Sequence, residues 1–245
     1  IQHAVTSERQ ISRDDAYVNM LRGTISCFAA SAGGAEVQTV LPFDTAAGLP
    51  TDFSRRTARN TQVVLAEESN VGRVNDPAGG SWFVESLTKQ LSDKAWAVFQ
   101  GLDGEGFAAA LADGTVTAQL DEVNAARAAQ LATRKIQLTG VSMFPNHEEA
   151  ALERKARPAA PELGGLKVVR DSQVFEDLRD RSAAARDAGN APTVLLACLG
   201  ARRDFGGREG FTSNLLHVGG LDTIVAEGET PEDFARQLTE SGAKV

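Results

Sequence analysis

Apolar and polar positions between residues 37 and 98 alternate with the two periods expected of strands and helices. Val37–Leu41 is a short apolar run with β-branched side chains, which predicts a strand that Pro42 ends. Thr51 and Asp52 stand where a helix N-cap belongs, so a helix is predicted to follow. Its mostly apolar face is expected to consist of Phe53, Thr57, Thr61, Val64 and Leu65.

A further helix is predicted after a second short extended piece and a Gly-rich turn. Asp76-Pro77 and Gly79-Gly80 break the chain, and Ser81 is the expected N-cap. The apolar side of this helix is expected to consist of Val84, Leu87, Leu91, Ala95 and Val98. Residues 14–30 are also predicted to be helical, whereas residues 1–13 are polar and irregular. Strands and helices that alternate with short links are typical of parallel α/β structure.

The pattern changes from Gly104 onward. A short helix is predicted at Gly106–Leu111, and a longer, Ala-rich helix at Val116–Leu138. Val141–Phe144 is a candidate short strand. An exposed linker is predicted at His147–Gly165, because this stretch is rich in Glu, Arg, Ala and Pro and lacks an apolar stripe.

A second α/β unit is predicted from Leu166 onward. Thr193–Leu199 is apolar almost throughout, as in a strand that is buried on both faces of a parallel sheet. A turn is expected at Gly200–Gly210. The other expected elements are helices at Phe175–Arg186, at Arg208–His217 and from the N-cap Thr230 to Leu238, a strand at Thr223–Ala226, and the start of a third strand at Ala243–Val245.

Composition narrows the functional classes. A net charge of −8 argues against nucleic acid or an anionic membrane as a partner, because both require basic patches. No apolar run approaches the roughly 20 residues that span a bilayer. Cys27 and Cys198 lie far apart in apolar segments, which indicates reduced core thiols in a cytoplasmic protein. The first residue is Ile rather than Met, so we expect the natural start to lie upstream.

Five short motifs within residues 40–88 are shared with one enzyme family. They are Phe43-Asp44, Gly48-Leu49-Pro50-Thr51, Ala58-Arg59-Asn60-Thr61-Gln62, Glu67-Glu68-Ser69, and Asp76-Pro77 with Gly80-Ser81. With these residues the chain resembles the acyl-CoA mutases, chiefly the methylmalonyl-CoA mutases, which use adenosylcobalamin to rearrange a carbon skeleton by a radical route. That family contains catalytic large chains and non-catalytic small chains, and both share this segment.

The resemblance implies an α/β fold in three parts. Residues 1–103 would be the C-terminal part of a TIM (β/α)8 barrel, which needs eight strands when it is complete. Residues 104–165 would be a helical segment and linker. Residues 166–245 would be the first half of a flavodoxin-like domain of the cobalamin-binding type.

One segment, Gly200–Gly207, decides what the resemblance implies for catalysis. Catalytic members carry Asp-x-His-x-x-Gly here, where the His ligates cobalt and the Asp holds the other ring nitrogen. In this chain Arg202 stands at the Asp position, Asp204 at the His position, and Gly207 matches the Gly. Arg cannot accept a hydrogen bond, and metal sites demand particular ligand types. We therefore favour a strand-to-helix turn that is kept for the fold over a cofactor loop.

The barrel part departs from the catalytic chains as well. Those chains carry Gln, His and Asn along the strand that faces the acyl group, whereas this chain has Glu36, Thr39 and Leu41. Glu67 replaces a Gln, and its charge would repel an anionic malonyl group. The resemblance therefore predicts that the chemistry has been lost from both parts.

Other reactive residues have less specific patterns. The candidates are an acid–base pair among Asp44, Glu67, Glu68 and Asp76, a CoA-phosphate site at Arg55, Arg56 and Arg59, and a phosphate cradle at Gly79-Gly80-Ser81. We favour the simpler alternatives of capping and surface charge, a solvated helix face, and a plain turn. His3, His147 and His217 are isolated and have no metal-binding spacing.

These departures predict a non-catalytic chain that holds a homologous catalytic large subunit in a heterodimer. The complex would interconvert methylmalonyl-CoA and succinyl-CoA, and adenosylcobalamin would be bound mainly by the partner. This chain itself would bind no cofactor and no metal, and it would meet the acyl-CoA only through the complex. Two alternatives stay open: an active mutase chain that binds cobalamin itself, and an interaction module without a mutase partner.

Overall fold

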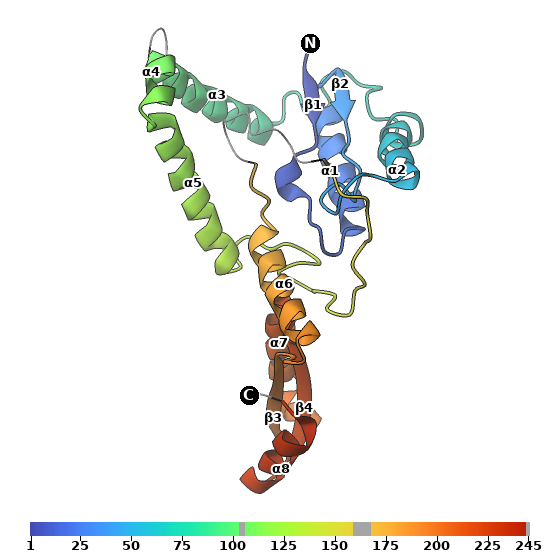
Figure 1. Ribbon diagram of the computed structural model, residues 1–245. Helices are drawn as coiled ribbons and strands as arrows, with labels where there is room; N and C mark the ends of the chain where they lie inside the picture. Colours follow the sequence, from blue (N-terminus) through green and yellow to red (C-terminus); the bar gives the residue numbers. More distant parts are fainter. Residues whose placement is uncertain (103–105, 159–167, 244–245) are drawn as a thin grey trace.

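The computed structural model describes residues 1–102, 106–158 and 168–243. Figure 1 shows an N-terminal α/β unit, an arm of three helices and a C-terminal α/β unit in chain order. In each α/β unit the described residues form two strands that pair in parallel. The α/β class predicted from the sequence is therefore confirmed.

The N-terminal unit is built on two short strands, β1 (His3–Val5) and β2 (Val37–Thr39), paired from His3 with Val37 to Val5 with Thr39. The connection between them holds a 3-10 turn, η1 (Glu8–Gln10), and helix α1 (Val18–Ala32). β2 and α1 confirm the predicted strand and helix. β1 contradicts the prediction that residues 1–13 are irregular, because three residues are too few for a strand period to show in the sequence.

Helix α2 (Asp52–Val63) begins at Thr51, as predicted. The Thr51 hydroxyl accepts a hydrogen bond of 3.2 Å from the Ser54 N–H, which satisfies one of the free donors at the helix start. The helix continues into a π turn, η2 (Val64–Glu68). Residues 70–81 are turns and bends, so the predicted second extended piece is absent from this described stretch.

The buried side of α2 differs from the predicted apolar face. Phe53 is 60% exposed and Val64 is 42% exposed, whereas Ser54 and Ala58 are buried. Small side chains on this side allow α2 to lie close to α1, which it contacts. Cys27, Val40, Ala58 and Leu65 form the small core between these elements. The apolar period therefore located the helix, but of its predicted face only Leu65 is buried.

The arm consists of α3 (Trp82–Leu102), α4 (Gly106–Ala112) and α5 (Thr115–Ala132). Figure 1 shows α3 and α4 standing away from the two α/β units. No described residue of α3 is buried, and the side chains of Trp82 and Leu91 are 92% and 60% exposed. The helix is where the sequence predicted it, but every residue of its predicted apolar side is exposed.

The predicted helix Val116–Leu138 is wrong at its end, because α5 stops at Ala132. Arg134 takes a left-handed conformation with φ of 56°, which turns the chain and ends the helix. Leu138 then packs on the core of the C-terminal unit. The candidate strand Val141–Phe144 is also wrong, since these residues form turns with a single bridge between Thr139 and Met143.

The C-terminal unit matches the predicted order. It contains α6 (Gln173–Asp187), β3 (Thr193–Leu199), α7 (Arg202–Val218), β4 (Asp222–Gly228) and α8 (Pro231–Ser241). β3 pairs with β4 from Thr193 with Asp222 to Leu199 with Gly228. Thr230 caps α8 as predicted, and the Asp233 carboxylate accepts a hydrogen bond of 3.3 Å from the Thr230 N–H in return.

The core of this unit extends to the end of the arm. Leu131, at the end of α5, is buried together with Val141, Phe175 and Val218. The helical arm is therefore attached to the rest of the chain through the C-terminal half of α5, where Arg127 also pairs with Asp171. The predicted start of the second unit at Leu166, the pattern change at Gly104, and Lys244 and Val245 of the predicted third strand lie outside the described residues.

Candidate functional site

The segment after β3 is a helix start rather than the predicted turn Gly200–Gly210. Gly200 has φ of 88°, which a side chain would disfavour, and α7 begins two residues later at Arg202. The Asp204 carboxylate accepts a hydrogen bond of 3.3 Å from the Ala201 N–H. Ala201 has no side-chain acceptor, so Asp204 provides the only side-chain half of this cap. An acid in the first turn also suits the positive end of the helix dipole.

The chemistry of this segment does not suit a cobalt ligand. The carboxylate of Asp204 is committed to the helix start, and a further contact of 3.6 Å joins it to Arg203. Arg202 offers donors only. Within the described ranges, no group of three His, Cys, Asp or Glu side chains is placed to hold a metal ion. The residues present therefore do not fit a cobalamin that is ligated from below by a protein imidazole.

Three of the four positions at which the resemblance predicts a departure from catalytic chains, Glu36, Thr39 and Leu41, lie at the β1–β2 pair, whereas Glu67 lies on η2. The Glu36 carboxylate accepts a hydrogen bond of 2.6 Å from the Gln2 N–H, and this bond lowers the pKa of Glu36. Thr39 Oγ1 lies 2.9 Å from His3 Nε2, and the Leu41 N–H donates to Thr6 at 2.8 Å. These side chains and backbone groups hold the start of the chain beside β2.

The four candidate carboxylates do not come together. Asp44 is fully buried, whereas Glu67 and Glu68 are exposed on η2, and Asp76 lies in a turn with φ of 48°. A carboxylate pair for acid–base chemistry is therefore not formed by them. The alternative of surface charge is wrong for Asp44, because its Oδ2 accepts a hydrogen bond of 2.7 Å from Arg154 Nε.

The predicted linker is fastened to the N-terminal unit through this buried pair. Besides the Arg154–Asp44 contact, the Leu49 N–H donates to the Lys155 carbonyl at 2.8 Å. A Cβ on Gly48 would lie 2.7 Å from the same carbonyl oxygen, so only glycine fits there. The described part of the predicted exposed linker, residues 147–158, is therefore exposed over most of its length but bound at this point.

The remaining candidates behave as surface features. Arg55 donates to the Pro50 carbonyl at 2.9 Å and stays exposed, as does Arg59. Arg56 is exposed on the same helix, and residues 79–81 form an exposed turn before α3. Cys27 and Cys198 are buried free thiols, as predicted, and burial raises the pKa of both.

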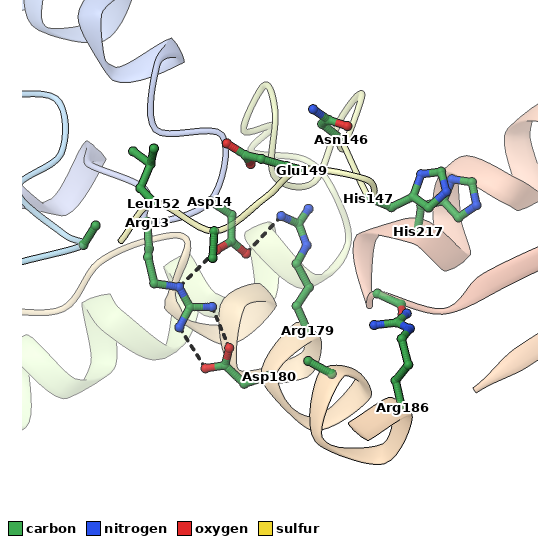
Figure 2. A pocket seen from close by; sticks show the side chains of 14 residues that line it. Arg13, Asp14, Asn146, His147, Glu149, Leu152, Arg179, Asp180, Arg186 and His217 are labelled. Carbon is green, nitrogen blue, oxygen red and sulfur yellow. Dashed lines mark hydrogen bonds and ion pairs between the residues drawn. The ribbon is translucent and has the colours of Figure 1, made fainter. Parts of the chain in front are cut away.

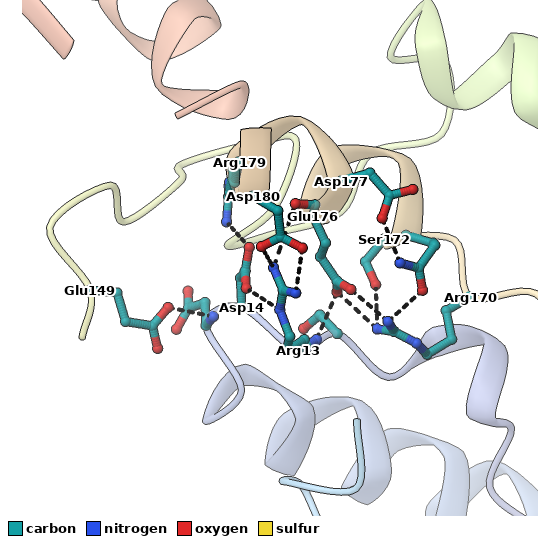
Figure 3. Close-up of polar contacts among 12 residues, drawn as sticks. Arg13, Asp14, Glu149, Arg170, Ser172, Glu176, Asp177, Arg179 and Asp180 are labelled. Atoms are coloured by element: carbon teal, nitrogen blue, oxygen red, sulfur yellow. Dashed lines mark hydrogen bonds and ion pairs between the residues drawn. The ribbon is translucent and has the colours of Figure 1, made fainter. Parts of the chain in front are cut away.

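A network of ion pairs, which the sequence did not predict, joins the N-terminal unit to α6 (Figure 3). Arg13 binds the Asp180 carboxylate with both terminal nitrogens, at 2.7 and 2.8 Å. Arg170 holds the fully buried Glu176 at 2.6 Å, and the Arg13 N–H donates to the other oxygen of Glu176 at 2.8 Å. Burial alone would raise the pKa of Glu176, but these donors outweigh it and lower the pKa. Charged residues separated by over 160 positions give no sequence signal of such a contact.

Beside this network lies a cavity of about 250 Å³ at the junction of the two units (Figure 2). Its cationic side chains are engaged by carboxylates: Arg179 with Asp14 at 3.1 Å and Arg186 with Asp222 at 3.0 Å. His147 and His217 stack at its rim, with ring centroids 3.7 Å apart. The prediction that these histidines are isolated is therefore wrong for two of the three. The balanced charges of the cavity give an acyl-CoA phosphate no free cation among the residues named here.

Two parallel α/β units joined through a helical arm place the chain among the α/β proteins, and known relatives define it further. A family model described as methylmalonyl-CoA mutase matches residues 1–202. The chain is 52% identical over its full length to the methylmalonyl-CoA mutase small subunit of Propionibacterium freudenreichii subsp. shermanii, of which it covers 38%. The chain belongs to the methylmalonyl-CoA mutase family.

Two other relatives show the range of the family. The methylmalonyl-CoA mutase small subunit of Streptomyces virginiae is 45% identical over the full chain, which covers 40% of that protein. A methylmalonyl-CoA mutase of Escherichia coli strain K12 is 38% identical over 60% of the chain, which covers 21% of the enzyme. The chain spans about two-fifths of the length of the small subunits that it matches. No helix in the described ranges has the length and apolar character needed to cross a membrane.

Proposed function

We propose that this chain is part of the small, non-catalytic subunit of an adenosylcobalamin-dependent methylmalonyl-CoA mutase in the cytoplasm. In this role it supports a homologous catalytic large subunit in a heterodimer that interconverts methylmalonyl-CoA and succinyl-CoA. The names of the relatives support the small-subunit role. The large subunit binds the cofactor and the acyl-CoA substrate.

The observation that carries this proposal is the use of Asp204. A His at this position would have to point its ring toward the cobalt, and a neighbouring carboxylate would have to hold that ring. Here the Asp204 side chain turns back to the Ala201 N–H, and Arg202 supplies no acceptor. The segment has become the first turn of α7, which stabilises the fold and leaves cofactor chemistry to the partner.

The domain assignments belong to the same proposal. β1, β2, α1 and α2 would be the C-terminal part of a (β/α)8 barrel, with residues 1–103 as its extent. β3, α7, β4 and α8 would be the first half of a flavodoxin-like domain, over residues 166–245. The parallel pairing within each unit supports both assignments, because such connections place a helix between parallel strands.

Cobalamin binding tests the proposal. Adenosylcobalamin is titrated into the purified small subunit, into the large subunit as a positive control, and into their complex, with the absorption spectrum recorded throughout. We expect a protein nitrogen on cobalt in the large subunit and in the complex, and none in the small subunit alone. A nitrogen-ligated spectrum from the small subunit alone would show an active chain.

A pull-down separates the remaining alternative. The tagged small subunit should retain the large subunit through washing and gel filtration, in one-to-one stoichiometry. If the two chains migrate separately under conditions in which the large subunit is folded and binds cobalamin, the chain is an interaction module without a mutase partner.

A further inference from the structure

The contact between His147 and His217 joins two parts of the chain that are far apart in sequence. His147 lies in the turn-rich segment 139–158, and His217 lies in the last turn of α7. Their rings stack with centroids 3.7 Å apart and planes inclined by 19°. His217 Nε2 also lies 3.0 Å from Thr223 Oγ1 on β4. The stack therefore lies where the segment meets the C-terminal unit, as Figure 2 shows.

The other end of the same segment is held by the N-terminal unit. The Glu149 carboxylate, two residues beyond His147, accepts a hydrogen bond of 2.5 Å from the Asp15 N–H. Arg154 then anchors the segment through the buried Asp44. The segment thus bridges the two α/β units, and the imidazole stack is part of its attachment to α7.

We propose that the His147–His217 stack is a pH-sensitive contact, closed when both rings are neutral and opened when they gain protons. Two imidazolium rings at this separation repel each other, whereas neutral rings attract through their faces. Histidine is the side chain whose charge changes within the pH range that cells and their compartments span. This inference stands independently of the role proposed for the subunit.

The charged groups around the stack determine whether protonation of His217 is favoured or opposed. α7 contributes Glu209, β4 contributes Asp222, and the segment contributes Glu148, whose carboxylate lies 4.0 Å from His147. These acids favour the protonated form of His217, but Asp222 is already bound by Arg186 of α6. Burial, followed by the neighbouring His147, outweighs them and lowers the pKa of His217.

The sign follows from linkage between protonation and opening. Because the closed state has the lower His217 pKa, it binds fewer protons than the open state. The closed contact is therefore fully stable when the pH is above 6.5, the ordinary pKa of histidine, and it loses stability as the pH falls through that value. A metal does not explain the pair, since no third ligating side chain joins these histidines in the described ranges.

Hydrogen exchange followed by mass spectrometry on the intact protein tests this contact. Peptides that contain His147 and His217 are compared between about pH 7.5 and about pH 5.5, a range that brackets histidine titration, after correction for intrinsic exchange. We expect the opening equilibrium of these peptides to rise on acidification, because the open state binds more protons. An opening equilibrium that does not change with pH would overturn the proposal.

Three variants identify the responsible group. His147→Phe keeps an aromatic ring on His217 but cannot be charged, so the part of the rise that comes from repulsion between the rings should disappear and only the part that comes from burial of His217 should remain. His147→Asn removes the stack and should leave the peptides open at both pH values, which guards against a misfolded Phe variant. His3→Phe is the matched control on β1 and should behave as the unmodified protein. A pH-dependent rise that is as large in His147→Phe as in the unmodified protein would assign the effect to another group and refute the stack as its origin.

Discussion

Breaking the ion pair between Arg170 and Glu176 should lower the stability of the fold far more than breaking an exposed ion pair would. The Glu176 side chain has no exposure to solvent and Arg170 has 19%, with 2.6 Å between Nη2 and Oε2. Arg170→Met removes the guanidinium but keeps much of the apolar stem. Glu176 would then be a buried charge, and of the donors named above only the Arg13 N–H would remain to stabilise its carboxylate.

Breaking a buried pair by removing one partner costs about 3–5 kcal/mol, because the remaining charge is left without compensation. Against a typical free energy of unfolding of about 5–15 kcal/mol, this loss is a large fraction. In a chain of this size it corresponds to a fall in Tm of about 6–20 °C, at about 2–4 °C per kcal/mol. Denaturant unfolding of the intact protein, with m compared between variants, gives the difference directly.

Arg186→Met is the matched control. The same substitution at Arg186, in the last turn of α6, breaks the pair with Asp222, in which the side chains are 43% and 39% exposed. Exposed pairs contribute about 0–1 kcal/mol, so Arg186→Met should shift Tm by no more than a few degrees. Equal effects of the two substitutions would refute the claim that burial of Glu176 sets the magnitude.

The double variant Arg170→Met/Glu176→Met separates the pair from its environment. Replacing both charges by apolar side chains should recover much of the lost stability, since no buried charge remains. The pH dependence gives a second check. Because the pKa of Glu176 lies below its usual 4.5 in the folded protein, its contribution is present above that value and is lost as the pH falls through the folded pKa. Glu176→Met should remove this part of the acid dependence.

Three further outcomes are expected. Asp204→Ala should lower the unfolding free energy by about 0.5–1 kcal/mol, because it removes the hydrogen bond at the start of α7, and steady-state assays should show unchanged turnover by the assembled mutase. A loss of turnover by orders of magnitude would make the segment catalytic. Gly48→Ala should release the segment around Lys155, which faster proteolysis at that segment would show. In contrast, the Cβ added by Gly207→Ala meets no atom within 4 Å, so this substitution should stabilise α7 by about 0.5–1 kcal/mol. Residues 1–245 expressed alone should bind a hydrophobic dye and self-associate, because α3 buries none of its side chains; a sharp melt from a monodisperse monomer would contradict this.

Local features of the fold were predictable because their causes are local. Thr51 and Thr230 cap helices through bonds to residues three positions away. The apolar run Thr193–Leu199 is strand over its whole length, but the prediction that both of its faces are buried is wrong, since only Cys198 is buried in the described structure. The start of α7 was missed although its signal was also local. Asp204 follows Ala201 by three residues, which is the spacing of a helix start, but the three glycines at 200, 206 and 207 outweighed it in favour of a turn.

Contacts between distant segments could not be predicted from one sequence. Arg13 and Asp180, Asp44 and Arg154, and the two histidines each combine residues of ordinary surface types, and their pairing depends on how the units dock. The Phe43-Asp44 motif marked Asp44 as a residue shared with the family, but it did not reveal that this carboxylate is buried. Burial was hard to predict for the same reason: the face of α2 that packs on α1 is lined by small residues, which carry no apolar period.

The exposed arm and the altered segment at β3 support one interpretation of how the chain contributes to its assembly. A catalytic site would have to keep specific side chains free for cofactor and substrate. Here Asp204 and Glu36 accept hydrogen bonds from backbone N–H groups, and Asp44 binds the Arg154 side chain. Asp44 is buried, and Asp204 and Glu36 stay exposed, but each of the three carboxylates is engaged within the chain itself. In contrast, α3 leaves Trp82 and Trp96 exposed at 92% and 59%, and a helix with such side chains on several faces needs surrounding protein. These features fit the proposed role, in which the chain packs against other protein and leaves the active site to its partner.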